Sequence, residues 1–126
     1  MNRVDSLEHM FELREKFMSR MRDIKPHEYP TWPIDVGDKK AQQHVRDMAL
    51  RGVEEMFEAL QHLKNWKPHR DTQVTEFNRD EFIEEVVDAF NYFLSVLVLV
   101  GVDASEFFDA YREKNNIIHS RLDSGY

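Results

Sequence analysis

Cysteine is absent from this chain of 126 residues, and glycine and proline are scarce, with four of each. The lack of cysteine excludes disulfides, a thiol nucleophile and any cysteine-ligated zinc or iron–sulfur site. Apolar side chains recur at helical spacing over long segments, and strict alternation is missing. Apolar residues make up 41% of the chain, which is enough for a core. We therefore predict a single all-α domain over residues 1–126.

The chain also has fewer basic than acidic residues and has no long apolar run. Lys and Arg number 17 against 24 Asp and Glu, so the net charge is −7. This balance argues against non-specific nucleic-acid binding, which needs a basic patch to neutralise phosphates. The longest apolar stretch, residues 93–100, is too short for a bilayer, which takes about 20 residues. The first ten residues lack the apolar core of a signal peptide, so we expect a cytoplasmic protein that binds neither nucleic acid nor a membrane.

Four helices are predicted from apolar periodicity and from capping signals. Three capping-box pairs mark helix starts: Asp5 with Glu8, Asn78 with Glu81, and Asp103 with Glu106. The predicted ranges are about 6–24, 38 to before Pro68, 79–101 and 104–122. The far half of the third helix is apolar around its circumference, which is typical of a bundle centre or a subunit interface. We predict a four-helix bundle that forms a homodimer or homotetramer.

The segment between the first two helices is not expected to be helical. Residues 25–37 contain Pro26, Pro30 and Pro33, which exclude a regular helix. We predict an extended, proline-containing arm whose aromatic side chains need a place to be buried. Trp32 in this arm is a candidate for stacking on a base, although a tryptophan more often has a packing role.

Two pairs of acidic residues stand out on the second and third predicted helices. Glu55 with Glu58, and Glu85 with Asp88, are each three positions apart, so each pair projects from one helix face. Apolar residues flank them: Phe57 and Leu60 the first pair, and Val86, Val87 and Phe90 the second. We therefore expect the carboxylates to border the interior. Like charges near a core are costly unless a cation neutralises them, and Mg²⁺ prefers oxygen ligands.

Other interpretations of these acids are possible. A di-iron carboxylate bundle needs Glu-x-x-His units, and none occurs, since His62 follows Glu58 by four positions. The six histidines are scattered without the spacing of zinc ligands. The acids could also be ordinary solvated residues of amphipathic helices. If the helical phase differed, Glu54 or Glu84 could take the place of a neighbour.

The acidic pattern resembles that of a known enzyme family. The motif consists of E-x-x-E, then 26 intervening residues from 59 to 84, then E-x-x-D. It resembles the motif of the all-α nucleoside triphosphate pyrophosphohydrolases, which include MazG-like enzymes and dimeric dUTPases. The segment Lys64-Asn65-Trp66-Lys67 is similar to a Trp-Lys segment of the dimeric dUTPases. The ending, with Lys114-Asn115, Arg121 and Gly125-Tyr126, resembles their C-terminal signature. The resemblance covers roughly residues 40–126.

The resemblance implies a Mg²⁺-dependent enzyme, with Mn²⁺ as a possible substitute, that converts a (d)NTP into (d)NMP and pyrophosphate. It makes four acids the metal ligands and catalytic residues: Glu55, Glu58, Glu85 and Asp88. Four cationic residues would contact the substrate phosphates: Lys64, Lys67, Lys114 and Arg121. Apart from the resemblance, four residues are candidates to contact the base or sugar: Arg14, Trp32, Asn91 and Asn115. Of the four acids, Glu55 is the candidate to accept a proton from the attacking water.

Some positions depart from the dUTPase pattern. Arg14 stands where a Gln that reads the base is expected, and Ile118 and Leu122 replace an Asn and a Gln. Uracil specificity is therefore not implied, and purine or modified dNTPs are alternative substrates. A guanidinium at Arg14 could donate two hydrogen bonds to a purine edge. A non-enzymatic helical interaction module remains the alternative from another functional class.

Overall fold

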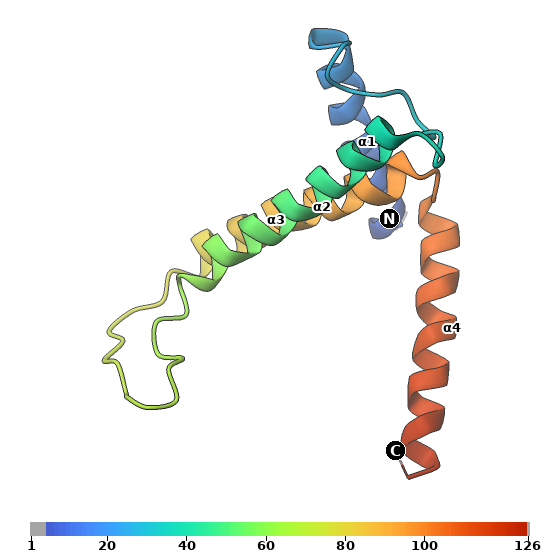
Figure 1. Cartoon of the computed structure of the whole chain (residues 1–126). Helices are drawn as coiled ribbons and strands as arrows, with labels where there is room; N and C mark the ends of the chain where they lie inside the picture. The colour runs from blue at the N-terminus through green and yellow to red at the C-terminus, as the bar shows by residue number, and fades with distance from the viewer. Residues whose placement is uncertain (1–4, 126) are drawn as a thin grey trace, which may run out of the picture. The chain divides into compact units, whose positions relative to one another are not determined.

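The computed structural model describes residues 5–125, and these residues form four α-helices and no strand (Figure 1). The helices are α1 (Ser6–Ile24), α2 (Lys39–Leu60), α3 (Arg79–Leu99) and α4 (Ala104–Asp123). The prediction of an all-α chain with four helices is confirmed, and it is consistent with the four-helix bundle class. No single helix among the described residues is long and apolar enough to cross a membrane, and only α3 and α4 taken together across a bend meet that length and composition.

Capping side chains fix where the helices begin, because each satisfies a backbone amide that has no partner within the first turn. Four side chains accept such a bond: Asp5 from the amide of Glu8 (3.1 Å), Asp38 from that of Ala41 (2.9 Å), Asn78 from that of Glu81 (3.1 Å) and Asp103 from that of Glu106 (2.8 Å). The three capping boxes in the sequence thus mark three real helix starts. After α3 ends, Gly101 adopts a φ of 83°, and its amide donates to the carbonyl of Val98 at 3.0 Å.

The second helix is shorter than predicted. It ends at Leu60, whereas the sequence predicted a helix that continues almost to Pro68. The amides of His62 and Leu63 bond to carbonyls only three residues back, at 3.1 and 3.0 Å, so the last turn tightens and the α-helical pattern stops. Residues 61–78 form a loop, which the bond from the Thr72 amide to Asn65 Oδ1 closes at 2.8 Å.

The chain divides into two compact units, and the prediction of one domain over residues 1–126 stays a prediction. The first unit contains α1, α4 and the end of α3, within residues 5–34 and 97–125. Phe11 of α1 is buried, and its ring centroid lies 6.4 Å from that of Phe107 of α4. The amide of Ile34 donates to the carbonyl of the buried Leu99 at 2.8 Å, which attaches the end of the arm to α3. Residues 25–38 contain no regular helix or strand.

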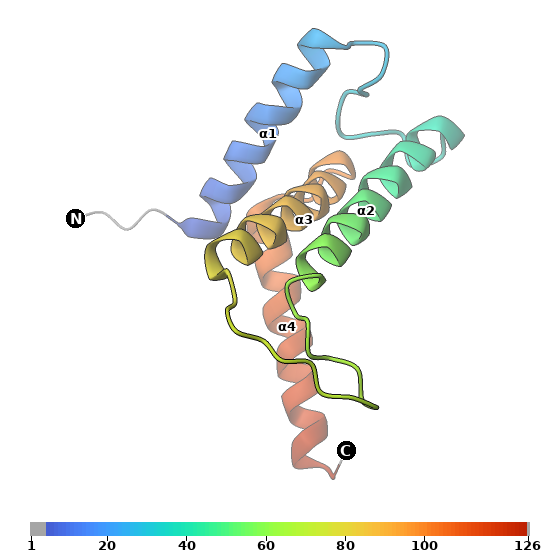
Figure 2. The same cartoon turned by 90° about the vertical axis from the view of Figure 1, so that its left-hand side faces the viewer.

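The second unit, residues 35–96, is a hairpin in which α2 and α3 run side by side in opposite directions (Figures 1 and 2). Gly52 permits their close approach, since a Cβ at this position would lie 2.5 Å from the ring of Phe93. Ala59 of α2 and Ala89 of α3 are fully buried, and small side chains of this kind allow two helices to approach closely. Leu94 and Ser95 are also buried, in agreement with the predicted burial of the far half of α3.

Candidate functional site

The four predicted acids all belong to the hairpin of α2 and α3. Glu55 and Glu85 are partly buried, whereas Glu58 and Asp88 are exposed. Burial raises the pKa of Glu55 above its usual value, and the charges of Glu58, Asp88 and Glu85 raise it further. Because the charges of the other three acids act on Glu55, carboxylates from both helices share one electrostatic environment. The neighbours Glu54 and Glu84 are both exposed.

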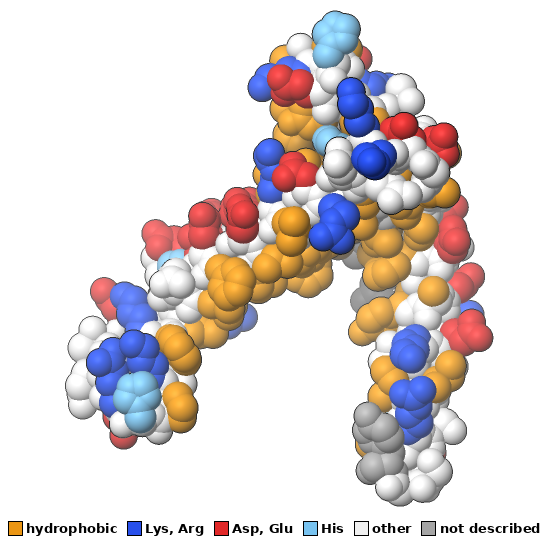
Figure 3. All heavy atoms as spheres, viewed as in Figure 1, with side chains coloured by type: hydrophobic (Ala, Val, Ile, Leu, Met, Phe, Trp, Pro, Cys, Tyr) orange, Lys and Arg blue, Asp and Glu red, His pale blue; other side chains and the backbone are white. Residues whose placement is uncertain are grey.

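The predicted apolar surroundings of these acids are wrong in part. Phe57, Leu60, Val87 and Phe90 are exposed, with accessible fractions between 42% and 60%. At about 100° per residue, Phe57 points some 200° away from Glu55, so the two side chains leave the helix on different sides. Figure 3 shows acidic side chains along one edge of the hairpin and hydrophobic side chains along another. The acids therefore border the seam between the two helices, and these apolar neighbours do not enclose them.

One residue at the open end of the hairpin contacts an acid directly. Nε2 of His62 lies 2.7 Å from Oε2 of Glu85, and both side chains are largely covered, at 19% and 31% exposed. Glu85 Oε2 is buried and has no aligned hydrogen bond among the described residues. Buried carboxylate oxygens normally have a donor or a cation as partner. This oxygen is thus short of one partner, which fits a carboxylate that takes part in cation binding.

At the other end of the group of four acids, the side chains of Arg51 and Tyr92 form a pair. Arg51 precedes Glu55 by one turn of α2, and Tyr92 follows Asp88 by one turn of α3. A hydrogen bond with Tyr92 is the main cause that raises the pKa of Arg51, and the charge of Asp47 adds to it. Arg51 Nε also donates to Asp47 Oδ2 at 3.0 Å. A fixed guanidinium one turn from the carboxylates could contact an anionic ligand that they bind through a cation.

Sequence reasoning missed Arg51, Tyr92 and His62. Each is four positions from a predicted acid on its own helix or just beyond it, so the i, i+4 rule could have placed them on the same face. Asn91, which the sequence did single out, also lies in the hairpin and is partly buried. Its backbone carbonyl accepts from Ser95 Oγ at 3.2 Å.

Two predicted phosphate contacts lie in the loop that follows α2. Lys64 is exposed and Lys67 is partly buried, and Lys67 Nζ lies 5.8 Å from the ring centroid of Trp66. Trp66 itself is 68% exposed. Basic side chains gather at this loop end of the hairpin (Figure 3). The structure thus places these lysines in the same unit as the acids, beyond the end of the helix that carries Glu58.

The remaining predicted contacts belong to the other unit, so their roles at the acids stay predictions. Arg14 lies over the ring of Phe17 at 4.5 Å. The guanidinium of Arg22 lies 4.7 Å from the ring centroid of Trp32, so that one face of this indole already has a partner. On α4, Asn115 Nδ2 donates to the carbonyl of Tyr111 at 2.8 Å, and Lys114 and Arg121 are exposed.

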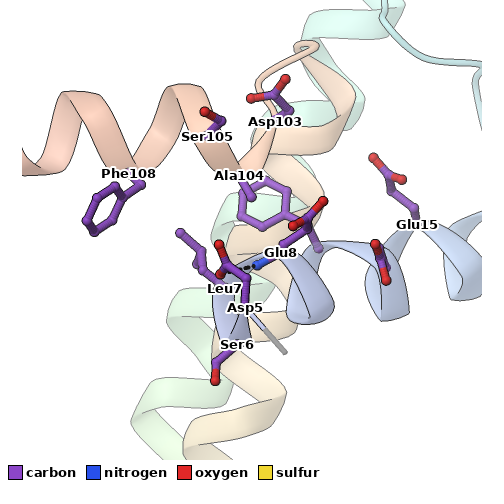
Figure 4. A pocket seen from close by; sticks show the side chains of 11 residues that line it. Asp5, Ser6, Leu7, Glu8, Glu15, Asp103, Ala104, Ser105 and Phe108 are labelled. Atoms are coloured by element: carbon purple, nitrogen blue, oxygen red, sulfur yellow. Dashed lines mark hydrogen bonds between the residues drawn. The ribbon is translucent and has the colours of Figure 1, made fainter. Parts of the chain in front are cut away.

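A pocket in that other unit lies between the first turns of α1 and α4 (Figure 4). Acidic side chains line much of it: Asp5, Glu8, Glu12, Glu15 and Asp103. Asp5 and Asp103 already accept hydrogen bonds as helix caps. None of the described residues that line the pocket is basic, and the negative charge of its carboxylates opposes binding of a triphosphate, so we do not assign it as the substrate site.

The donor set of the hairpin fits a hard divalent cation in its chemistry. All four side chains offer carboxylate oxygens, which Mg²⁺ and Mn²⁺ prefer, and no sulfur ligand is present. Across residues 5–125, however, no three potential ligands are arranged closely enough to hold a metal ion. Binding would therefore require the carboxylates to draw together, which their mutual repulsion opposes until a cation is present.

The chain has weak sequence similarity to a curated nucleotide pyrophosphatase. No family model and no solved structure matches the chain. A curated protein does match, and it supports a relationship to the nucleotide pyrophosphatases. This relative is a dCTP pyrophosphatase of Enterobacteria phage LZ5, 22% identical over an alignment of 147 residues that spans all of this chain and 86% of the relative.

Proposed function

We propose that this protein is a Mg²⁺-dependent pyrophosphohydrolase that converts a deoxynucleoside triphosphate into its monophosphate and pyrophosphate. The observation that carries the proposal is the group of four acids at the seam of α2 and α3, where burial and then the charges of three carboxylates raise the pKa of Glu55. The likeness to a dCTP pyrophosphatase supports this reaction class. The proposal includes membership of the all-α pyrophosphohydrolases, with the MazG-like enzymes and dimeric dUTPases. Because the relative is named for dCTP, dCTP is the first substrate to test.

In this proposal Glu55, Glu58, Glu85 and Asp88 hold Mg²⁺, or Mn²⁺ in its place. The bound metal supplies charge neutralisation for the triphosphate and lowers the pKa of a coordinated water. Glu55 is the candidate to accept a proton from the attacking water, through a carboxylate oxygen that the cation does not occupy. Lys64 and Lys67 stabilise the negative charge on the departing pyrophosphate.

The first test removes one acid from each helix. We expect Glu58→Ala and Asp88→Ala to fold but to release pyrophosphate at least about a hundredfold more slowly, in line with loss of a group that acts on the reacting atoms. The assay measures pyrophosphate release from a panel of dNTPs, including dCTP, with Mg²⁺. Glu54→Ala and Glu84→Ala are matched controls, since each removes one exposed carboxylate from the same helix. Wild-type turnover in Glu58→Ala or Asp88→Ala would exclude the assigned site.

The same variants separate an enzyme from a helical interaction module. Millimolar Mg²⁺ or Mn²⁺ raises the melting temperature of a protein that binds the ion in its folded state, by mass action. We expect this rise in the wild-type protein and in the two controls, and a smaller rise in Glu58→Ala and Asp88→Ala. A melting temperature that does not respond to either ion in the wild-type protein would favour the module.

A further inference from the structure

We propose that His62 is a positioning residue of this site, whose imidazole holds the carboxylate of Glu85 in the orientation that binds a cation together with the other three acids. The proposal rests on the proposed function, because it concerns the same cation site. It adds a residue that the acidic motif does not contain. His62 follows the end of α2, and Glu85 lies in the second turn of α3.

The contact between these residues is tertiary and largely shielded from solvent. Nε2 of His62 and Oε2 of Glu85 are 2.7 Å apart, and their side chains are 19% and 31% exposed. No described residue, His62 included, donates a well-aligned hydrogen bond to this buried oxygen, so the close approach of Nε2 is the contact that bears on it. The imidazole is therefore the group best placed to decide where Oε2 points, and holding this oxygen determines where the other carboxylate oxygen points as well.

Aromatic neighbours hold the imidazole in place. The ring of Phe82, in the first turn of α3, meets the His62 ring edge to face, with centroids 6.4 Å apart and an interplanar angle of 78°. Phe77, at the end of the loop, lies 5.4 Å from Phe82. The backbone of His62 is also fixed, since its amide donates to the carbonyl of Ala59 at 3.1 Å. A side chain held at both its ring and its backbone can orient a neighbour without itself binding the cation.

Nε2 of an imidazole can carry a proton and act as a donor, and at 2.7 Å from Oε2 a slight turn of the ring would align this N–H with the carboxylate. Groups that hydrogen-bond to metal ligands in this way typically change metal affinity by about 10- to 100-fold. The effect expected of His62 is therefore on the affinity for the cation in the first place, and on turnover as a consequence.

The test compares variants that differ in where they place a donor. The side-chain amide of Gln reaches about as far as Nε2 of His, whereas that of Asn reaches only about as far as Nδ1. We expect His62→Gln to bind Mn²⁺ within about threefold of the wild-type affinity, and His62→Ala and His62→Asn to bind it about 10- to 100-fold more weakly. Mn²⁺ binding to the nucleotide-free, full-length protein is measured by electron paramagnetic resonance. His69→Ala, in the exposed part of the loop, is the control and should bind like wild type.

The outcomes separate this proposal from the proposed function. If the wild-type protein binds Mn²⁺ and His62→Asn binds it equally well, the positioning role is overturned while the enzyme assignment stands. If the wild-type protein does not bind Mn²⁺, the proposed function fails, and the role of His62 fails with it. Circular dichroism shows whether each variant folds. If His62→Ala does not fold, the comparison of His62→Gln with His62→Asn still decides, because both keep a polar side chain of similar volume.

Discussion

His44 on α2 is a residue whose surroundings make stability depend on pH. Burial lowers the pKa of its imidazole below the usual value of 6.5, and the charge of Arg51 lowers it further, against the opposing effect of Asp47. Below pH 6.5 the unfolded chain therefore binds a proton that the folded chain resists. The stabilisation is present above this pH and is lost as the pH falls through the lowered pKa of the folded state.

We predict that the free energy of unfolding of the wild-type protein falls more steeply than that of His44→Gln between about pH 7.5 and pH 5. Urea unfolding in the presence of a chelator measures both, so that cation binding does not contribute. His27→Gln is the control because His27 is exposed. Equal pH dependence in the wild-type protein and His44→Gln would show that His44 does not carry the effect.

The four acids could be predicted from the sequence because their spacing is local. Two carboxylates three positions apart on a helix share a face wherever that helix packs. His62 with Glu85 and Arg51 with Tyr92 are different, because the first contact joins the start of the loop after α2 to α3 and the second joins α2 to α3. Which residues meet across α2 and α3 depends on the register of the hairpin, and periodicity within one helix does not determine this register. The predicted burial around Phe57 failed for a different reason, since its position two residues after Glu55 places it on another side of the same helix.

At the scale of the helices, a close contact between Gly52 and Phe93 maintains that register. Gly52 of α2 meets the ring of Phe93 of α3, where a Cβ would lie 2.5 Å from a ring carbon. We predict that Gly52→Ala lowers the free energy of unfolding by about 1 to 2 kcal/mol, because the clash outweighs the helix propensity of about 1 kcal/mol that alanine gains. Urea unfolding monitored by circular dichroism measures the change.

The matched experiment makes the same substitution after the ring has been removed. In a Phe93→Leu background the clash is relieved, so Gly52→Ala should be neutral or stabilising by up to about 1 kcal/mol. The difference between the two backgrounds is the coupling between the helices at this point. An equal loss of stability in both backgrounds would mean that the ring of Phe93 is not what requires glycine.

Helix starts were predictable and one helix end was not. Asp5, Asn78 and Asp103 each accept the backbone hydrogen bond that their capping boxes predicted. These signals are contained within four residues, so no tertiary information is needed. The end of α2 has no such local signal. Apolar residues continue to Leu63, and the helix stops earlier because the last amides bond three residues back.

At the scale of the whole molecule, the most prominent feature is apolar surface at helical spacing. All four described helices carry such stripes, with every residue between 41% and 65% exposed. The stripes are Met10, Leu13, Phe17 and Ile24 on α1, Leu50, Val53, Phe57 and Leu60 on α2, Ile83, Val87 and Phe90 on α3, and Phe108, Tyr111, Ile118 and Leu122 on α4. Apolar stripes at this spacing are typical of helices that pack against other helices. A second copy of the chain offers the same stripes and would cover them symmetrically.

We predict that the protein is a homodimer or homotetramer at micromolar concentration, as measured by sedimentation velocity. Leu50→Lys should shift it towards the monomer, because an unpaired charge inside an interface is costly. On a free surface the same substitution would change stability by no more than about 0.5 kcal/mol. Gln43→Lys adds the same charge at an exposed polar position of α2 and should leave the assembly intact. A monomeric wild-type protein would refute the prediction. An assembly that Leu50→Lys does not weaken would instead exclude the α2 stripe and leave those on α1, α3 and α4.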